Sequence, residues 1–428
     1  MALTKVTGKG IDGGTISTET AGTNNLILGS TAGDSIQSGG NYNTCIGDVA
    51  GTAITTGDYN VTVGYIAGDA ITTGERNVVA GHSAGGALTS GGSNTAIGDR
   101  ALLADTQGSD SVAIGRNALF AQNFTSATSP YNIAIGRDAG ATISTGQKNT
   151  FVGGLAGDAT DDGASNVAVG YLALSANCGD DNTAVGESAL EACTGSSNVA
   201  VGRRAGEAVI GGSGNVLVGI QAGDAITSGQ DNVIVGRLSG TYEDNLTTAN
   251  GNVLIGPYND STDGTTNYAH GLGYNLNCAP GYTTLGLGSD DIRAAHGNTT
   301  WSTVSDERYK KDIVDSTAGL SFINALKPRT FKYKNLGELP ETFKAYKVNS
   351  TDVFKNSNTN HGFIAQEVKT AIDADSGIKD GFKLWDKRAD GSQEVAEAAL
   401  IPILVKAVQE LSTALDAAVA RIKKLEDG

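Results

Sequence analysis

The chain has 428 residues, enough for two or three domains, and a net charge of −16 at neutral pH. Residues 305–428 hold 19 basic and 19 acidic side chains and 7 of the 60 glycines, so residues 1–304 carry the net charge and most of the glycine. This acidic part has no cluster of Lys and Arg, which argues against a nucleic-acid-binding protein. The change in composition predicts a domain boundary at residues 301–305.

Two simple features limit the environment of the protein. The sequence has no apolar run of signal-peptide length at its start and none approaching the ~18 residues of a membrane span, so we expect cytoplasmic synthesis and no membrane insertion. The four cysteines lie among small apolar residues without metal-ligand spacing; they are Cys45, Cys178, Cys193 and Cys278. We expect them to be buried and reduced, and we predict no metal or cofactor.

An internal repeat runs from Asn25 to Gly256. Each unit is Asn or Ser, three small or β-branched residues, and Gly four positions on. Fourteen copies follow at spacings of 16 to 18 residues, except for two spacings of 21 and 20. They begin at Asn25, Asn43, Asn60, Asn77, Asn94, Ser111, Asn132, Asn149, Asn166, Asn182, Asn198, Asn215, Asn232 and Asn252. A period of about 17 residues is too short for a helical hairpin or a propeller blade and fits one coil of a β-solenoid.

Each coil is predicted to hold two short strands and two turns. Gly supplies positive φ at the corners, and Asn or Ser bonds to nearby backbone. The second part of the unit, such as residues 67–74, is a short apolar run that ends in another glycine turn. Fourteen coils stacked at about 4.8 Å predict a rod of about 65 Å.

The residues between Asn and Gly indicate self-association. A two-layered solenoid with one wet face would alternate apolar and polar residues here, but residues 167–169, 199–201, 216–218 and 233–235 are apolar throughout. Both faces of the strand should therefore be dry. One face fills the coil, and the other needs a partner, which a closed symmetric assembly of identical chains supplies.

Units such as Asn198–Gly202 and Ser111–Gly115 resemble the head repeats of trimeric autotransporter adhesins, over about Asn25 to Gly256. The resemblance implies a left-handed parallel β-roll with three chains around one axis, so we expect a homotrimer with its shaft at residues 25–256. The sequence departs from these adhesins because it lacks a secretion signal and a C-terminal membrane anchor.

After the repeat, the sequence pattern changes twice. Residues 257–304 stay rich in Gly, Thr and Asn and are predicted to form a β-rich neck. Apolar residues at helix spacing predict a helix over 316–326 that Pro328 ends. Residues 330–334 alternate like a strand, which predicts an α+β domain at the C-terminus.

Residues 398–426 are predicted to form a helix with a heptad seam. Its apolar residues are spaced by three and four positions in turn, so they lie on one stripe. They are Ile401, Leu404, Val408, Leu411, Leu415, Ala418, Ile422 and Leu425. A trimeric coiled coil is favoured because the repeats also call for self-association, and packing on its own domain is the alternative.

Three segments of residues 305–428 resemble the intramolecular chaperone domain that ends many phage tail fibres, tail spikes and endosialidases. They are Ser305–Ile313, His361–Val368 and Leu404–Leu411. The resemblance implies a domain that brings three chains together, starts their registered folding, and is released by autoproteolysis at a serine. The family's serine falls on Ser305 and its lysine on Lys310. The segment from Tyr333 to His361 is longer than in the family, and we expect a protruding loop there.

Ser305 and Lys310 suit a serine peptidase that acts once. A lysine in a dry pocket can take the serine proton, and the Ser305 hydroxyl would then attack the Val304 carbonyl, cutting between these two residues. Five residues on a continuous helix turn the chain by about 500°, so the two side chains would not share a face. We expect the segment to bend, or the lysine to come from a neighbouring chain, with the site complete only in the trimer.

Other interpretations of this segment remain open. Ser305 could simply cap a helix whose first turn carries Asp306 and Glu307. Asp306 and Arg308 could support the site or be solvated charges. His361 is expected to pack at a strand end rather than act as a base.

The two resemblances together imply a structural phage fibre for host adsorption, located in the virion and assembled in the host cytoplasm. Residues 1–24 are expected to attach it to a tail or capsid protein, and the receptor is expected to be a glycan or an outer-membrane component. Two lengthened coils carry Phe120, Phe124, Tyr131 and Tyr242 on loops, where binding is common in solenoids; tolerated surface turns are the alternative.

Two alternative functions come from other classes. The missing signal and anchor disfavour a bacterial trimeric surface adhesin. A polysaccharide-degrading tail spike needs a carboxylate pair in a cleft, whereas the repeats have short turns with scattered acids. No turnover enzyme is therefore expected.

Overall fold

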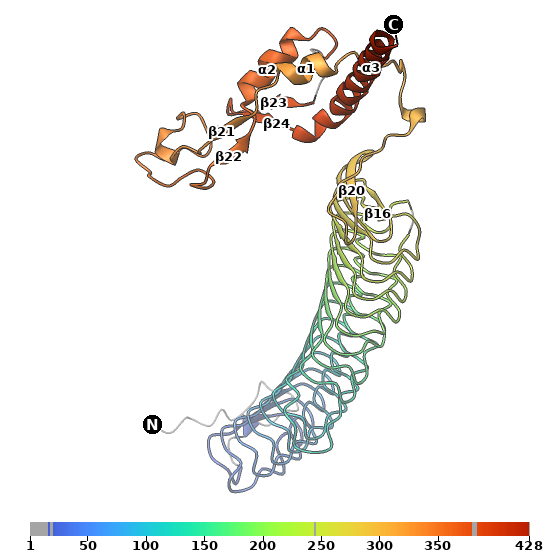
Figure 1. Ribbon diagram of the computed structural model, residues 1–428. Coiled ribbons are helices and arrows are strands. Elements are labelled where there is room, and N and C mark those ends of the chain that lie inside the picture. The colour runs from blue at the N-terminus through green and yellow to red at the C-terminus, as the bar shows by residue number, and fades with distance from the viewer. Residues whose placement is uncertain (1–15, 18–19, 244, 379–382, 428) are drawn as a thin grey trace. The chain divides into compact units, whose positions relative to one another are not determined.

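The computed structural model describes residues 16–17, 20–243, 245–378 and 383–427. The chain divides into two compact units, Met1–Val304 and Ser305–Gly428. The first is a stack of β-solenoid coils, and the second is a small α+β unit that ends in a long helix (Figure 1). The predicted fold class is thus confirmed for the single chain.

Each of the fourteen motifs forms a three-residue strand, and consecutive strands pair in parallel. The strands are β2 (Leu26–Leu28), β3 (Thr44–Ile46), β4 (Val61–Val63), β5 (Val78–Ala80), β6 (Thr95–Ile97), β7 (Val112–Ile114), β8 (Ile133–Ile135), β9 (Thr150–Val152), β10 (Val167–Val169), β11 (Thr183–Val185), β12 (Val199–Val201), β13 (Val216–Val218), β14 (Val233–Val235) and β15 (Val253–Ile255). Equivalent motif positions are in register, so each position forms a continuous row along the shaft.

The middle residue of each strand lies inside the coil. Ala168, Leu217 and Ile234 are fully buried, as are their equivalents in most other coils. The first and third residues face outward and are half-buried or exposed; Val169 and Val201 are 37% and 38% exposed. The outward rows are therefore apolar surfaces that one chain leaves in contact with water.

In the coils from β2 to β14 the second part is a run of turns, so the predicted second strand is wrong there. Ala67 and Ile71 are buried as expected. However, Gly68 has a φ of 57°, and the Ile71 N–H donates to the Gly68 carbonyl at 3.2 Å. These local bonds wind the segment on itself, while the Gly68 N–H donates to the Ala84 carbonyl of the next coil at 2.9 Å.

The glycine that ends each strand is required by both conformation and space. Gly64 has a φ of 130°, which L side chains rarely adopt. A Cβ atom there would lie 2.7 Å from the Gly81 carbonyl oxygen of the next coil. The close stacking of corners therefore explains why glycine recurs four residues after Asn.

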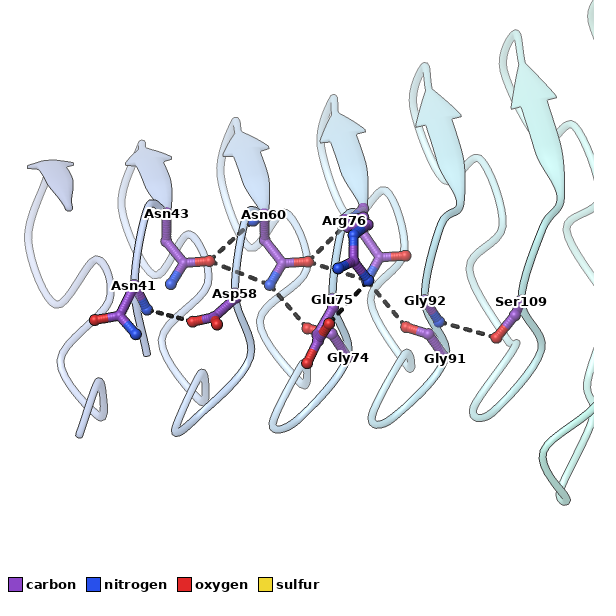
Figure 2. Close-up of polar contacts among 11 residues, drawn as sticks. Asn41, Asn43, Asp58, Asn60, Gly74, Glu75, Arg76, Gly91, Gly92 and Ser109 are labelled. Atoms are coloured by element: carbon purple, nitrogen blue, oxygen red, sulfur yellow. Dashed lines mark hydrogen bonds and ion pairs between the residues drawn. The ribbon is translucent and has the colours of Figure 1, made fainter. Parts of the chain in front are cut away.

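Buried Asn side chains form a ladder between coils (Figure 2). Asn60 is fully buried, and its Nδ2 donates to the Gly74 carbonyl at 2.8 Å and to Asn43 Oδ1 at 3.2 Å. Asn60 Oδ1 accepts from the backbone N–H and Nδ2 of Asn77, both at 3.0 Å. The predicted bonding of Asn to backbone is confirmed, and it joins each coil to both neighbours.

The ladder changes at Ser111, where the motif lacks its Asn. Gln122 of the lengthened coil takes over: its Nε2 donates to Ser111 Oγ at 3.1 Å and to Asp105 Oδ2 at 2.6 Å. Gln122 Oε1 accepts from Asn132 Nδ2 at 2.9 Å, which reconnects the ladder. All four side chains are fully buried, so the longer spacing here supplies a replacement polar group.

The solenoid, and with it the shaft, continues past the last predicted motif into the residues predicted to form the neck. β17 (His270–Tyr274) and β19 (Tyr282–Leu287) extend the parallel sheet, and β20 (Asp290–Ala295) turns back antiparallel to β19. The Asn position is taken by Ala269, whose backbone N–H donates to Asn252 Oδ1 at 2.8 Å. The side-chain ladder of this row therefore ends at Asn252.

Short strands lie near both ends of the shaft. β16 (Asp260–Ser261) pairs in parallel with β18 (Asn277–Cys278) on another side of the last coils. At the N-terminal end, β1 (Ile16–Ser17) pairs antiparallel with β2. Most of the attachment peptide predicted at 1–24 lies outside the described residues.

The cysteine prediction is confirmed for all four residues. Cys45, Cys178, Cys193 and Cys278 are buried and free in the shaft. Burial raises the pKa of Cys193 to about 11 and that of Cys278 to about 12. The thiols therefore act as small apolar packing groups.

The C-terminal unit has a core of its own. Phe322, Val368, Ile372, Leu384 and Ile403 are buried there. Its elements are η1 (Glu307–Tyr309), α1 (Leu320–Ala325), β21 (Arg329–Phe331), η2 (Leu336–Glu338), β22 (Asn360–Gly362), α2 (Ala365–Ala374), β23 (Trp385–Lys387), β24 (Gln393–Val395), η3 (Glu397–Leu400) and α3 (Ile401–Glu426). β21 pairs with β22 and β23 with β24, both antiparallel.

Helix α3 packs on its own unit through a stripe different from the heptad seam. Ile403 and Ala407 are buried, and the Glu410 carboxylate accepts from the Leu320 N–H at the start of α1 at 2.8 Å. The eight predicted seam residues, from Ile401 to Leu425, are all exposed. Packing of the seam on its own domain, the alternative considered above, therefore does not occur within this chain.

The same helix corrects one expectation about membranes. Within the described residues, the segment Glu397–Glu426 is long and apolar enough to cross a membrane by length and composition, with a mean hydropathy of 1.4. The expectation that no stretch approaches this limit is wrong. Its apolar residues follow a heptad spacing with Lys406, Glu410 and Asp416 between them, which is the pattern of a coiled-coil helix.

Candidate functional site

Ser305 and Lys310 meet within one chain. Lys310 Nζ donates to Ser305 Oγ at 2.7 Å. Between them, η1 is a single 3₁₀ turn, and Lys310 is extended at φ −117° and ψ 148°. The 3₁₀ turn ends before Lys310, and the chain becomes extended there. The segment therefore has the bend that the five-residue spacing required.

Asp306 and Arg308 hold this turn. The Asp306 carboxylate caps η1 by accepting from the Arg308 backbone N–H at 2.8 Å, and it pairs with the Arg308 guanidinium at 2.7 and 3.0 Å. The guanidinium and the backbone N–H lower the pKa of Asp306. Asp306, rather than Ser305, is therefore the N-cap, which leaves the Ser305 hydroxyl available to Lys310.

The pair is exposed in the single chain. Val304 is 52% exposed, and Ser305 and Lys310 are also exposed. A lysine becomes an effective base where burial favours its neutral amine. One chain supplies the geometry of a serine and lysine pair but not the dry surroundings.

The segment that carries the pair has apolar side chains with no cover from its own chain. Residues 307–317 are all exposed. Tyr309, Ile313 and Val314 are 76%, 63% and 86% exposed. Three large apolar side chains on one short segment form an exposed apolar surface of the kind that marks an interaction site.

His361 lies apart from this turn in the fold. It is in β22 opposite Thr330 of β21, and it is exposed, so the expectation that it packs at a strand end is wrong. It lines a groove of about 580 Å³ together with Pro328, Arg329, Thr330, Gly362, Phe363 and Glu397. Beside the groove, Arg329 pairs with Glu367 at 2.6 Å and lowers the pKa of that carboxylate.

The aromatic residues of the lengthened coils differ in exposure. Tyr131 and Tyr242 are 58% and 49% exposed, and Phe120 is half-buried with the Arg100 guanidinium 5.9 Å from its ring centre. Phe124 is only 7% exposed, contrary to its prediction as a receptor-binding residue. The Phe124 backbone N–H donates to Asp105 Oδ1 at 3.1 Å. Asp105 is one of the side chains that replace the Asn ladder at Ser111.

Residues 305–376 match the family model described as chaperone of endosialidase. This part of the C-terminal unit is therefore similar to an endosialidase-type chaperone domain. The match begins at Ser305, which is also the first residue of the second compact unit. No curated protein and no solved structure matches the chain. The protein therefore joins a segment similar to this chaperone domain to a β-solenoid shaft, and the likeness of its repeats to adhesin heads remains an expectation.

Sequence reasoning missed the aromatic pairs that line the shaft. Tyr42 and Tyr59 stack with ring centres 5.0 Å apart, and Tyr258 lies between Tyr242 and Tyr274 at 4.8 and 5.6 Å. A signal for the first pair was present, because both tyrosines directly precede a motif Asn. Residues at the same position in successive motifs become neighbours when the coils stack.

Proposed function

We propose that the protein is a subunit of a homotrimeric phage fibre for host adsorption, whose chaperone domain assembles the chains and is then released by cleavage between Val304 and Ser305. The observation that carries this proposal is the 2.7 Å hydrogen bond from Lys310 Nζ to Ser305 Oγ, placed where the chaperone domain begins. A lysine amine in this position can accept the serine proton as Oγ attacks the preceding carbonyl.

The attack on Val304 fits the covalent order of the atoms. Ser305 Oγ attacks the Val304 carbonyl carbon, the Val304–Ser305 peptide bond breaks, and the released Ser305 amine takes up a proton. Water then hydrolyses the Val304 ester and regenerates the Ser305 hydroxyl. Lys310 holds the hydroxyl proton at the first step and returns it to the leaving amine.

Self-association is supported by two separate apolar surfaces. The outward strand rows run along the shaft, and the exposed heptad seam runs along α3. Three copies around one axis would cover both. The exposed turn at Ser305 would become dry in the same step, which links cleavage to assembly.

Cleavage is tested by expressing wild type, Ser305→Ala and Lys310→Ala at full length. We expect two bands on a denaturing gel for wild type, with the smaller fragment starting at Ser305, and one full-length band for both variants. Sedimentation should give trimers in all three samples. A different cut site, or normal cutting by Ser305→Ala, would overturn the mechanism without affecting the trimer.

Host adsorption is tested separately. Antibody against the shaft should label virions and block their adsorption, and crosslinking should join residues 1–24 to a tail or capsid protein. Labelling of a bacterial surface in the absence of virus would instead favour an adhesin. Loss of viscosity of host polysaccharide on incubation would favour a tail-spike enzyme.

A further inference from the structure

Two histidines meet at the C-terminal end of the shaft. His270 begins β17, and His296 directly follows β20, where its backbone N–H donates to the Gly281 carbonyl at 2.7 Å. Their ring centres are 4.5 Å apart, with the ring planes inclined by 41°. His270 is half-buried and His296 is exposed.

The pair occupies the coil where the Asn ladder ends. Ala269 replaces the motif Asn, and the next residue is His270. His270 pairs in register with Val253 of β15 on one side and with Thr283 of β19 on the other. It therefore belongs to the outward-facing row formed by the first residue of each strand. The coil that loses the polar ladder thus places an imidazole on the surface through which the chains are proposed to associate.

The spacing of the rings suits two neighbouring ligands of an octahedral ion. With a metal–nitrogen bond of about 2.1 Å and about 1.1 Å from nitrogen to ring centre, imidazoles at a right angle have centres about 4.5 Å apart. At the tetrahedral angle the same lengths give about 5.2 Å. The observed 4.5 Å agrees with the right angle.

One chain offers too few ligands for such a site. Among the described residues of the single chain, no group of three His, Cys, Asp or Glu side chains could hold a metal ion. We propose that His270 and His296 from three copies bind one divalent transition-metal ion through six imidazole nitrogens. This inference rests on the homotrimer of the proposed function, because each copy supplies only two ligands.

The site would hold the chains together at a weak point of the shaft. The side-chain ladder of this row stops at Asn252, and the sheet ends with the antiparallel β20. Release of the chaperone at Val304 would separate α3 and its seam from the shaft. A shared ion would then replace the lost connection between subunits, which suits an ion with octahedral preference such as Ni²⁺, Co²⁺ or Fe²⁺.

The test uses the untagged full-length protein, treated with a chelator and then dialysed. Ni²⁺ binding is measured by calorimetry on wild type, on His270→Asn with His296→Asn, and on His82→Asn with His361→Asn. The last variant removes the other two of the four histidines and serves as the matched control. We expect one ion per three chains in wild type and control, and at least a hundredfold weaker binding in the His270 and His296 variant.

The Co²⁺ spectrum gives an independent readout of geometry. Wild type should show the weak visible absorption of six-coordinate Co²⁺, and His296→Asn alone should abolish it. Because His296 is exposed, this single variant should fold and sediment as wild type does. An intense tetrahedral spectrum, one ion per chain, or equal Ni²⁺ uptake after loss of His270 and His296 would each refute the shared site.

Sedimentation of the same samples separates the two proposals. A trimer that takes up no Ni²⁺ would show that the histidines are only a stacked pair, and the fibre proposal would stand. A soluble monomer would refute the homotrimer, and the shared metal site would fall with it.

Discussion

Replacing Asn60 with Ala interrupts the ladder at a coil where every partner is defined. The variant removes the Nδ2 bond to the Gly74 carbonyl at 2.8 Å and the Oδ1 bond from the Asn77 backbone N–H at 3.0 Å (Figure 2). It keeps the Asn60 backbone N–H, which donates to Asn43 Oδ1 at 2.9 Å. Toward the preceding coil the variant loses only the longer Nδ2 bond to Asn43 Oδ1, at 3.2 Å, so most of the damage falls on the junction with the next coil.

The cost of this change follows from burial. Asn60 and Asn77 are fully buried, so the backbone groups lose their Asn60 partner in a dry interior. A buried group left without a partner costs about 1–3 kcal/mol, so two such groups cost about 2–6 kcal/mol per chain. Opening of the coil at Asn77 should become easier by the same amount, which corresponds to about 30-fold or more in an equilibrium constant.

Hydrogen exchange at the Asn77 amide measures this effect directly. We expect exchange at least about 30-fold faster in Asn60→Ala, because of the 2–6 kcal/mol loss derived above. Thr62→Val is the matched control: Thr62 is fully buried in the same coil, but its hydroxyl faces the weakly polar Cys45 thiol. If Asn60→Ala exchanged like wild type, or if Thr62→Val were the worse variant, the ladder would not stabilise the stack.

Three further predictions concern association and the thiols. Leu411→Asp should abolish soluble trimer at synthesis because it places charge in the seam, whereas Thr413→Asp, exposed but off the seam, should leave the trimer yield unchanged. Val201→Asp in an outward strand row should likewise lower trimer content in sedimentation, and a normal trimer would disprove the role of that row. Cys193 and Cys278, with pKa raised to about 11 and about 12, should resist iodoacetamide at pH 8 in the native shaft and react after denaturation, as followed by mass spectrometry.

The solenoid was predictable because the Asn residues that repeat in the sequence also form the hydrogen bonds between coils. Motif spacing determined the strands, and Gly64 shows why the glycine is required. The second part of the coil was harder, because a short run such as residues 67–74 reads as a strand by composition. Non-glycine residues at positive φ, such as Tyr59 and Arg76, were also missed, because only tertiary stacking offsets their local cost.

The candidate site was predictable in its residues but not in its geometry. The spacing of Ser305 and Lys310 excluded a continuous helix without revealing what would bend it. The structure shows that the bend is the short turn capped by Asp306. From the sequence, Asp306 could equally have supported the site or been a solvated charge. Burial of Phe124 was missed because the repair of the ladder at Ser111 depends on contacts between coils.

The regularity that stabilises the shaft also explains why it needs a separate folding domain. Strands β10 and β12 have the same sequence, Val-Ala-Val, so a chain displaced by one or two coils would form nearly the same strand contacts with its neighbour. Such displaced trimers differ from the correct one mainly at the ends, and repeat arrays can nucleate anywhere along their length. Register therefore has to come from a non-repeating part of the chain, and in the proposed trimer the exposed seam of α3 would give the three chains one alignment. In the proposed trimer, the Asn ladder would hold the coils of each chain closed, so an aligned shaft would persist kinetically after release of the C-terminal unit.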